Sequence, residues 1–320
     1  MATSYLVTGG CGFIGSHLVE ALIARGHRVR VLDDLSSGSI ENLPRGAALQ
    51  RGDVANPGDV RTAMDGVAGC FHLAAIASVE RSTNDWLGTH RTNQSGTIAV
   101  LDAARRCGSQ VPIPVVYASS AAVYGDNTDL PLSETARPRP LSPYGADKYG
   151  SELHATVASE LYNVPTIGLR FFNVYGPRQD PRSPYSGVIS IFCDRLSQQG
   201  PIDIFGDGSQ TRDFVFVSDV VKALLAAMDR AFNCQGVYNV CSAEPVSILR
   251  LAHLVADLCG CKPEINFRPS RPGEIAHSCG DRTLVRAQLA LPDPVELRSG
   301  LTVTLAWASG LSSSEKRLGC

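Results

Sequence analysis

The sequence predicts an α/β protein with a doubly wound parallel sheet and a smaller C-terminal lobe. Two observations carry this prediction: short apolar runs alternate with amphipathic helical patterns through the first half of the chain, and this alternation breaks from about Asn173. The 320 residues, 44% hydrophobic and 19% charged, have an ordinary globular composition and can bury a sizeable core. A net charge of −2 gives no indication of a nucleic-acid partner.

The first element, Ser4–Gly15, reads as strand, glycine turn and helix, with glycines spaced G-x-x-G-x-x-G. Glycine lets a pyrophosphate approach main-chain N–H groups at a helix N-terminus. A plain strand-to-helix turn is the alternative, but a second strand, Arg28–Leu32, leads to Asp33, where a carboxylate can accept ribose hydroxyls. Asp33 would repel a 2′-phosphate, so NAD is favoured over NADP. The predicted contacts here are Gly9, Gly12, Phe13, Ile14, Gly15 and Asp33.

The following strands extend this cofactor site. A third strand, Ala47–Arg51, leads to Asp53, which is placed to bind an adenine amine, although a surface-turn aspartate would look the same. A fourth, Cys70–Ala75, ends in small residues against which a cofactor can lie, and its His72 is expected to be packed rather than catalytic. A helical pattern follows over Trp86–Cys107. The predicted cofactor contacts in this part are Asp53, Val54, Leu73, Ala74, Ala75 and Asn93.

The candidate catalytic residues follow the fifth strand, Val111–Ala118. Ser120 lies just beyond this strand, and Tyr144 and Lys148 stand one turn apart on a predicted helix that ends at about Tyr162. A phenol is a poor base at neutral pH, but a neighbouring ammonium and the nicotinamide charge favour the phenolate. Ser120 can hydrogen-bond the reacting oxygen. Alone, the Y-x-x-x-K spacing would be a chance helix pair; after this glycine loop and strand end, chance becomes the minor interpretation.

Motifs along nearly the whole chain resemble those of the extended short-chain dehydrogenase/reductase family, and within it the nucleotide-sugar epimerases. They are T-G-G-C-G-F-I-G (Thr8–Gly15), S-S-A-A-V-Y-G (Ser119–Gly125), Y-G-A-D-K (Tyr144–Lys148), R-F-F-N-V-Y-G-P-R (Arg170–Arg178), G-D-G-S-Q-T-R-D-F (Gly206–Phe214), V-S-D-V-V (Val217–Val221) and R-P-G-E (Arg271–Glu274).

The resemblance implies a Rossmann-type domain with NAD as cofactor. It further implies Tyr144 as base, Lys148 as its electrostatic partner and ribose contact, and Ser120 as oxyanion donor. The implied substrate contacts are Ser120, Asn173, Val188, Arg212, Arg271, Glu274 and Ser278. Arginine suits a diphosphate because its guanidinium offers paired donors, although a surface ion pair is the alternative for Arg212 and Arg271.

The expected reaction is epimerisation of a UDP-hexose at carbon 4 through a transient 4-keto sugar. Related 4,6-dehydratases and decarboxylases place an acidic residue where this chain has Ala121 and Ala122, and neither alanine can move a proton. Those reactions remain the enzymatic alternative. An NAD-binding redox sensor without chemistry is a second alternative, but it has no need of Tyr144, Lys148 and Ser120 together.

The resemblance also indicates an acetylated substrate. The stretches Arg178–Pro181 and Tyr185–Ile189 look like those of epimerases that accept N-acetylated hexosamines, and relatives restricted to plain sugars carry a bulky tyrosine where Ser278 stands. The expected pair is UDP-GlcNAc/UDP-GalNAc, with UDP-glucose/UDP-galactose as a further possibility. Polysaccharide biosynthesis is the pathway class that fits.

The expected organisation is an NAD-binding domain over residues 1–172 with return segments near 214–241, a substrate lobe over 173–307 and a flexible tail over 308–320. Residues 173–184 are expected to form a loop. The resemblance implies a homodimer, because in that family two such helices from each subunit form the dimer contact. Apolar residues on several faces of the two long helices fit this, although a monomer's core could also explain them.

The remaining expectations concern compartment and metals. No apolar run reaches the roughly 18 residues of a membrane helix, and the N-terminus leaves no room for a cleavable signal. The ten cysteines are scattered and lack zinc-ligand spacing, which favours reduced thiols in a cytoplasmic protein with no metal site.

Overall fold

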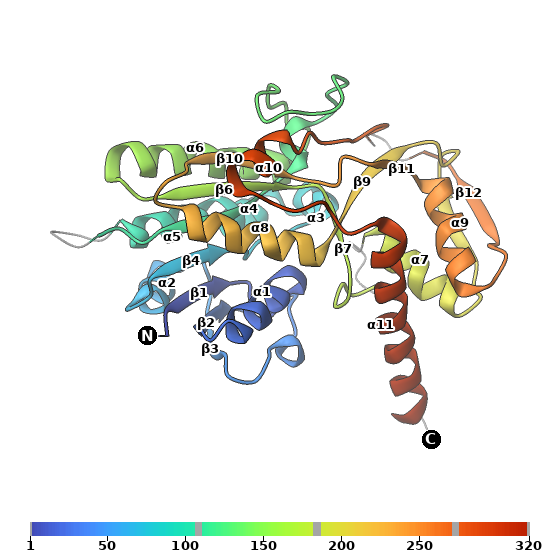
Figure 1. Ribbon diagram of the computed structural model, residues 1–320, viewed down its shortest axis with the longest axis horizontal. Helices are drawn as coiled ribbons and strands as arrows, with labels where there is room; N and C mark the ends of the chain where they lie inside the picture. The colour runs from blue at the N-terminus through green and yellow to red at the C-terminus, as the bar shows by residue number, and fades with distance from the viewer. Residues whose placement is uncertain (1, 106–110, 182–186, 271–274, 319–320) are drawn as a thin grey trace.

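The computed structural model describes residues 2–105, 111–181, 187–270 and 275–318, with side chains up to residue 310. Within these residues a seven-stranded sheet forms the centre of the larger domain, in the order β10-β6-β5-β4-β1-β2-β3 (Figure 1). All its neighbouring strands pair in parallel. The strands are β1 (Ser4–Thr8), β2 (Arg28–Asp33), β3 (Ala48–Arg51), β4 (Gly69–His72), β5 (Val115–Ser120), β6 (Thr166–Phe171) and β10 (Gly236–Val240).

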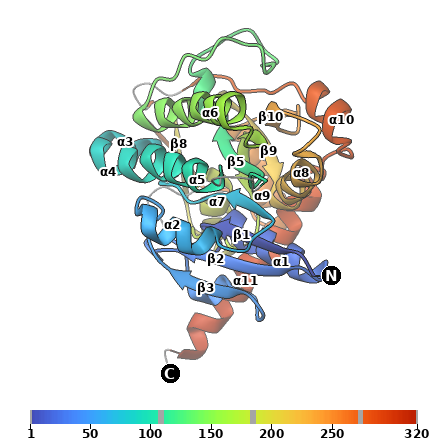
Figure 2. The same ribbon diagram turned by 90° about the vertical axis from the view of Figure 1, so that its left-hand side faces the viewer.

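Helices cover both faces of this sheet (Figure 2). On one face α1 (Phe13–Ala24), α8 (Val217–Arg230) and α10 (Thr283–Leu289) pack over a core that includes Leu18 and Leu224. The other face carries α2 (Pro57–Met64), α5 (Gly96–Ala104) and α6 (Pro143–Tyr162) over a second core. The helices α3 (Val79–Asn84) and α4 (Trp86–His90) and the short 3₁₀ turns η1 (Ile40–Asn42) and η3 (Ala121–Tyr124) complete this domain. The expected doubly wound parallel sheet is confirmed.

The strand order reverses between β1 and β4, because β2 lies on one side of β1 and β4 on the other. In such sheets ligands bind at the carboxyl ends of the strands, in the crevice at this switch point. The loops after β1 and β4 meet there: a Cβ added at Gly9 would lie 2.7 Å from the Ala74 main-chain nitrogen. The fold therefore brings the glycine loop and the Leu73–Ala75 segment to one place.

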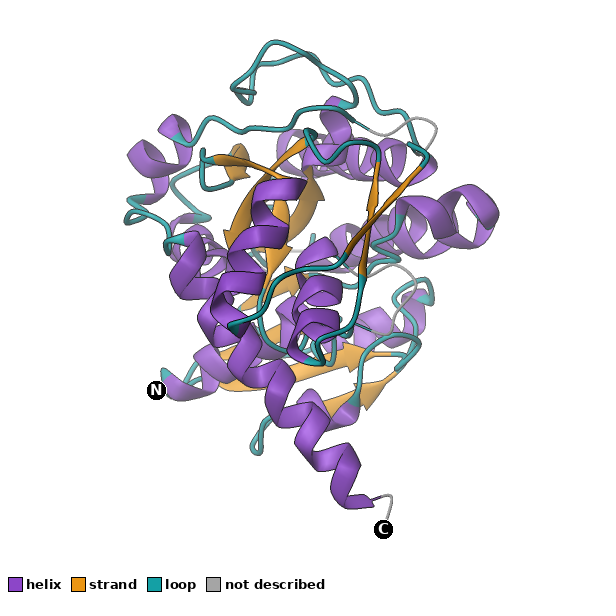
Figure 3. Ribbon diagram, turned by 90° about the vertical axis from the view of Figure 1, so that its right-hand side faces the viewer, coloured by secondary structure: helices purple, strands orange, loops and turns teal. Residues whose placement is uncertain are grey.

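The second half builds a lobe beside this sheet, on the right in Figure 1. Its core joins helices α7, α9 and α11 to strands β8 and β9. Figure 3 shows α11, the helix that ends at the C-terminus, lying along the outside of the lobe. The elements are β7 (Asn173–Tyr175), α7 (Val188–Ser197), β8 (Ile202–Phe205), β9 (Thr211–Phe216), β11 (Pro245–Ser247), α9 (Ile248–Cys259), β12 (Ile265–Arg268) and α11 (Leu297–Leu318).

Several elements differ from the sequence expectation. Strand β5 begins at Val115 rather than Val111, because Pro112 and Pro114 cannot donate to a ladder. Asn173–Tyr175 forms β7, paired with β9, instead of a loop. The segment 308–318, expected to be part of a flexible tail, continues helix α11 to Leu318. No proline falls in this segment, and its Glu315, Lys316 and Arg317 are favourable helix formers.

The helix expected over Trp86–Cys107 is divided. A π-helical turn, η2 (Arg91–Ser95), separates α4 from α5, and α5 ends at Ala104. Such turns are frequent at functional sites, and this one contains Asn93. In the parts of the chain that the structure describes, no helix is both long and apolar enough to span a bilayer.

Candidate active site

The glycine loop forms a cradle for a pyrophosphate. Gly12 caps α1 in an extended conformation, and α1 has neither a side-chain cap at its N-terminus nor an acidic residue in its first turn. A Cβ at Gly12 would meet only the Gly9 carbonyl oxygen, at 3.3 Å, whereas one at Gly15 would overlap that oxygen. Gly15 is thus required by packing of the loop, and Gly12 keeps the space beside the helix N-terminus clear. These residues fit a dinucleotide.

Asp33 fastens the same loop to the end of β2. Its side chain is buried, with Oδ2 accepting a hydrogen bond from the Cys11 N–H at 2.9 Å and Oδ1 accepting one from the Leu35 N–H at 2.9 Å. A carboxylate offers about four acceptor positions, so both oxygens retain capacity for ribose hydroxyls. The carboxylate therefore both orders the loop and suits an NAD ribose.

The other predicted cofactor contacts on this side are held by neighbouring residues. Asp53 pairs with Arg91 at 2.7 Å and accepts the Ala55 N–H. The side-chain amide of the buried Asn93 accepts a hydrogen bond from the Ile76 N–H at 2.8 Å and donates one to the Ile76 carbonyl at 3.2 Å. Asn93 thus holds the loop after β4, and the π-helical turn places it there. Val54 packs beside Gly96 at the start of α5.

The three candidate catalytic residues come together where β5 meets α6. The Lys148 ammonium lies 5.9 Å from the centre of the Tyr144 ring and donates to the Ala118 carbonyl at 2.9 Å. The Ser120 hydroxyl hydrogen-bonds to the Tyr144 phenol and accepts the Ala122 N–H at 3.1 Å. Helix α6, which carries Tyr144 and Lys148, begins at Pro143 because Ser142 caps it and proline is favoured in a first turn.

Burial sets the ionisation of these groups in the protein alone. It raises the pKa of Tyr144 above its ordinary value, with the Ser120 hydrogen bond acting in the opposite direction. It lowers the pKa of Lys148 to about 8, with Asp147 opposing this shift. Burial, with the Lys148 charge, lowers the pKa of His72 to about 3, and that ring bonds Thr8 and Thr97. The expectation that His72 is packed is confirmed.

The predicted substrate residues lie mainly on the lobe strands. Asn173 on β7 pairs with Phe214 on β9, two residues beyond Arg212. The Ser278 N–H donates to the Thr211 carbonyl at 3.2 Å, which places the Ser278 segment beside Arg212. Val188 begins α7 and is partly buried. Arg271 and Glu274 lie outside the described residues.

Asp213 is a buried carboxylate next to a predicted substrate residue that the motifs do not single out. It is fully buried next to Arg212 and accepts four hydrogen bonds, from the Ser242 N–H (2.7 Å) and hydroxyl (2.8 Å), the Ala243 N–H (3.0 Å) and the Gly280 N–H (3.1 Å). Burial raises its pKa, and these bonds oppose the shift. The sequence signal for Asp213 is a carboxylate at the start of the apolar run D-F-V-F-V, because a charge buried in such a run requires hydrogen-bond partners.

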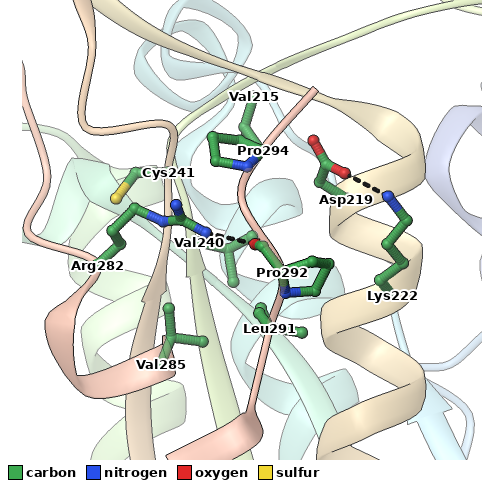
Figure 4. A pocket seen from close by; sticks show the side chains of 10 residues that line it. All are labelled: Val215, Asp219, Lys222, Val240, Cys241, Arg282, Val285, Leu291, Pro292 and Pro294. Carbon is green, nitrogen blue, oxygen red and sulfur yellow. Dashed lines mark hydrogen bonds and ion pairs between the residues drawn. The ribbon is translucent and has the colours of Figure 1, made fainter. Parts of the chain in front are cut away.

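A small cavity lies where segment 290–296 packs against α8 and β10 (Figure 4). Arg282 donates to the Pro292 carbonyl at 2.6 Å, and Lys222 pairs with Asp219 at 2.8 Å. None of the residues predicted to bind NAD or sugar lines it. Its lining is Val215, Asp219, Lys222, Val240, Cys241, Arg282, Val285, Leu291, Pro292 and Pro294.

Metal ligands do not gather anywhere in the described residues, where no group of three or more His, Cys, Asp or Glu side chains is placed to hold an ion. The cysteines in this part of the chain are free thiols.

Comparisons with known proteins agree with the motifs and the fold. The profile of the NAD dependent epimerase/dehydratase family matches residues 5–241. UDP-glucose 4-epimerase of Mycolicibacterium smegmatis is 38% identical over 307 residues, covering 94% of this chain and 96% of that protein.

Two solved structures have the same fold over nearly their full length. A UDP-N-acetylglucosamine 4-epimerase from Methanobrevibacter ruminantium, in complex with UDP-N-acetylmuramic acid, is similar with a TM-score of 0.91 and 33% identity, covering 97% of this chain and 99% of that one. UDP-glucose 4-epimerase from Thermus thermophilus, in complex with NAD, is similar with a TM-score of 0.88 and 35% identity, covering 96% of this chain and 99% of that one. The resemblance to the extended short-chain dehydrogenases/reductases is confirmed: the chain belongs to the NAD-dependent epimerase/dehydratase family and is an NAD-dependent epimerase.

Proposed function

We propose that this enzyme epimerises a UDP-hexose at carbon 4. The observation that carries the proposal is the grouping of Tyr144, Lys148 and Ser120 at the carboxyl edge of the sheet that also carries the glycine loop. The UDP-sugar is held between the NAD-binding domain, residues 1–172 with the segments near 214–241, and the lobe over residues 173–307. Arg212, Arg271 and Glu274 hold the UDP part, with Asn173 and Val188 nearby.

The chain's own residues move one proton. Tyr144 removes the proton of the 4-hydroxyl, Lys148 stabilises the resulting phenolate, and Ser120 donates a hydrogen bond to the oxygen of the 4-keto sugar. NAD, held by the glycine loop and Asp33, would supply the reversible hydride transfer at carbon 4. Because burial raises the pKa of Tyr144 in the protein alone, the phenolate depends on positive charge beside it.

Two alternatives are weaker. Dehydration or decarboxylation needs a further proton carrier, and Ala121 and Ala122 in η3 supply none beside Ser120. A redox sensor needs NAD but not a Tyr144–Lys148–Ser120 group.

The experiment uses purified protein with a UDP-hexose and no added cofactor. Epimer formation supports the proposal, and a 4-keto or decarboxylated product contradicts it. Tyr144→Phe, which removes only the proposed base, is expected to lower kcat by about 10²–10⁴-fold. Tyr149→Phe, in the same helix, is the matched control and should leave the rate unchanged. An undiminished rate in Tyr144→Phe would exclude the mechanism.

The substrate we propose is the UDP-GlcNAc/UDP-GalNAc pair, with UDP-glucose/UDP-galactose as a second pair. Ser278 supports this choice, because a small side chain beside Thr211 and Arg212 leaves volume for an acetamido group. Ser278→Tyr is expected to abolish turnover of the acetylated pair and spare the plain pair, measured with both pairs and with UDP-glucuronic acid. Ser278→Ala, which keeps the volume, is the control. Equal loss on both pairs in Ser278→Tyr would show that Ser278 does not determine which pair is accepted.

We further propose that the enzyme is a cytoplasmic homodimer in polysaccharide biosynthesis. Free thiols in the described residues support a reducing compartment. Leu153, Val157 and Leu161 form an exposed apolar stripe on α6, which supports a helix-to-helix contact between two copies.

A further inference from the structure

A buried ion pair that the proposed mechanism does not use lies directly beneath the catalytic group. Glu152 and Arg170 are 5% and 4% exposed. The guanidinium binds both carboxylate oxygens, from Nε to Oε1 at 2.8 Å and from Nη2 to Oε2 at 2.7 Å. Burying two charges has a large desolvation cost, and an apolar pair of similar volume would often serve stability as well. Its geometry therefore calls for an explanation besides stability.

The carboxylate joins the two elements that carry the candidate catalytic residues. On α6, Glu152 stands one turn beyond Lys148 and two turns beyond Tyr144, on the same face. The Ser119 hydroxyl donates to Glu152 Oε1 at 2.5 Å, and Ser119 directly precedes Ser120 on β5. Glu152 thus links the helix of the base to the strand end of the oxyanion donor.

The guanidinium holds the other side of Ser120. Its Nη1 donates to the Tyr124 hydroxyl at 2.8 Å and to the Glu134 carbonyl at 3.1 Å, and the Tyr124 hydroxyl donates to Asn239 at 2.7 Å. Tyr124 ends the 3₁₀ turn that Ser120 begins. Arg170 therefore makes four N–H hydrogen bonds: two to Glu152 on α6, one to Tyr124 in this turn and one to the Glu134 carbonyl.

The ion pair also determines which cation the Glu152 carboxylate binds. Lysine and glutamate four residues apart on a helix ordinarily attract each other. Here Arg170 takes both oxygens of Glu152, and the Lys148 ammonium instead binds the Ala118 carbonyl beside Tyr144. The other titratable groups that face Lys148 or the pair are His72, Tyr117, Tyr124, Glu134 and Asp147.

We propose that Glu152 and Arg170 are positioning residues for the proposed epimerisation: they set α6 against β5 so that Tyr144, Lys148 and Ser120 meet, and they keep the Glu152 carboxylate away from Lys148. The proposal rests on the proposed function for its kinetic consequence. Its second consequence, easier ionisation of the Tyr144 phenol, can be measured without turnover.

The test replaces both charges together. Glu152→Leu with Arg170→Met leaves no unpaired buried charge, so the variant is expected to fold with a Tm close to that of the wild type. Its kcat should fall about 10- to 100-fold, because small misplacements of reacting groups have effects of that size, while KM and the Kd for NAD stay within about twofold. Arg25→Met with Asp229→Leu, an exposed pair at 3.9 Å, is the control and should leave all four quantities unchanged.

A second readout follows Tyr144 itself. The ultraviolet titration of each NAD-loaded protein, minus that of its Tyr144→Phe counterpart, gives the pH of phenolate formation. This pH should rise in the double variant, and rise further in Arg170→Met, where Glu152 is released toward Lys148. Arg170→Lys, which keeps one charge, should recover part of the shift.

The outcomes separate the two proposals. A double variant with wild-type kcat and wild-type Tyr144 titration would show that the pair is structural only, as would a loss of rate matched by loss of folded protein. A wild-type protein that turns over no UDP-hexose would overturn the proposed function, and the titration would still decide the role of the pair. If Arg170→Met does not fold, the double variant decides alone.

Discussion

At the scale of single residues, Lys148 limits the pH range of the proposed base. Burial lowers the pKa of Lys148 to about 8 from its ordinary 10.5. The ammonium is present below this pH and is lost as the pH rises through it, so Tyr144 loses its positive neighbour on the alkaline side. We expect kcat to decline above about pH 8, measured as a pH–rate profile with a UDP-hexose.

The control for this prediction is Lys148→Arg. A guanidinium stays charged throughout this range, so the alkaline decline should disappear even though the longer side chain lowers the maximal rate. A decline that persists unchanged in the arginine variant would assign it to another group.

The residue pattern predicts local pairs better than distant ones. Tyr144 and Lys148 are recognisable because one helical turn fixes their relation. Glu152 and Arg170, by contrast, are brought together by the packing of α6 against β6, and Asp213 meets Gly280 across 67 residues of chain. Such partners depend on tertiary structure, which residue spacing does not encode.

At the scale of elements, two glycines of the same loop have different roles, one in packing and one in NAD binding. Gly15→Ala should cost about 1–3 kcal/mol of unfolding free energy, because its Cβ would overlap the Gly9 carbonyl. Gly12→Ala has an ordinary φ of −78° and a single tight contact, 3.3 Å from its Cβ to the Gly9 carbonyl oxygen. It should therefore lose less stability than Gly15→Ala but raise the Kd for NAD, roughly tenfold or more, by filling the pyrophosphate cradle.

Urea unfolding without NAD and calorimetric titration of NAD measure the two effects. Undiminished NAD affinity in Gly12→Ala would show that the pyrophosphate does not approach this residue.

Some element boundaries are set by neighbouring residues in the sequence, and others by tertiary contacts. Helix α9 has local signals at both ends, because Ser247 caps its start and Gly260 adopts the left-handed conformation at its end. The π-helical turn at Arg91–Ser95 has no comparable signal. Its Asn93 binds Ile76 of another segment, so the interruption depends on a tertiary contact.

At the scale of the whole molecule, the sequence predicts that the second half departs from the alternating pattern and that segments near 214–241 return to the main domain, but not how the strands of the lobe pair. Strand β10 joins the main sheet through β6, with Val240 opposite Phe171, whereas β12 pairs with β8 in the lobe. Both are short apolar strands followed by polar turns. Only packing against their separate cores distinguishes them, as Tyr238 in the main core and Ile265 beside the lobe core show.

Helix α6 carries an apolar stripe on its outer face that a second copy could cover. Leu153, Val157 and Leu161 are 53%, 47% and 67% exposed, one turn apart on the outer face of α6, and Ile98 on α5 is 40% exposed. If two copies cover this stripe, Leu153→Asp with Val157→Asp should shift the protein from dimer to monomer in sedimentation at micromolar concentration, without loss of helix content by circular dichroism. Val303→Asp, on an exposed position of α11, is the control. A wild type that sediments as a monomer, or a double variant that remains dimeric, would contradict the proposed contact.

Because the opposite face of α6 carries Tyr144 and Lys148, the kcat of the monomer would also measure how far the base depends on a second copy holding this helix in place.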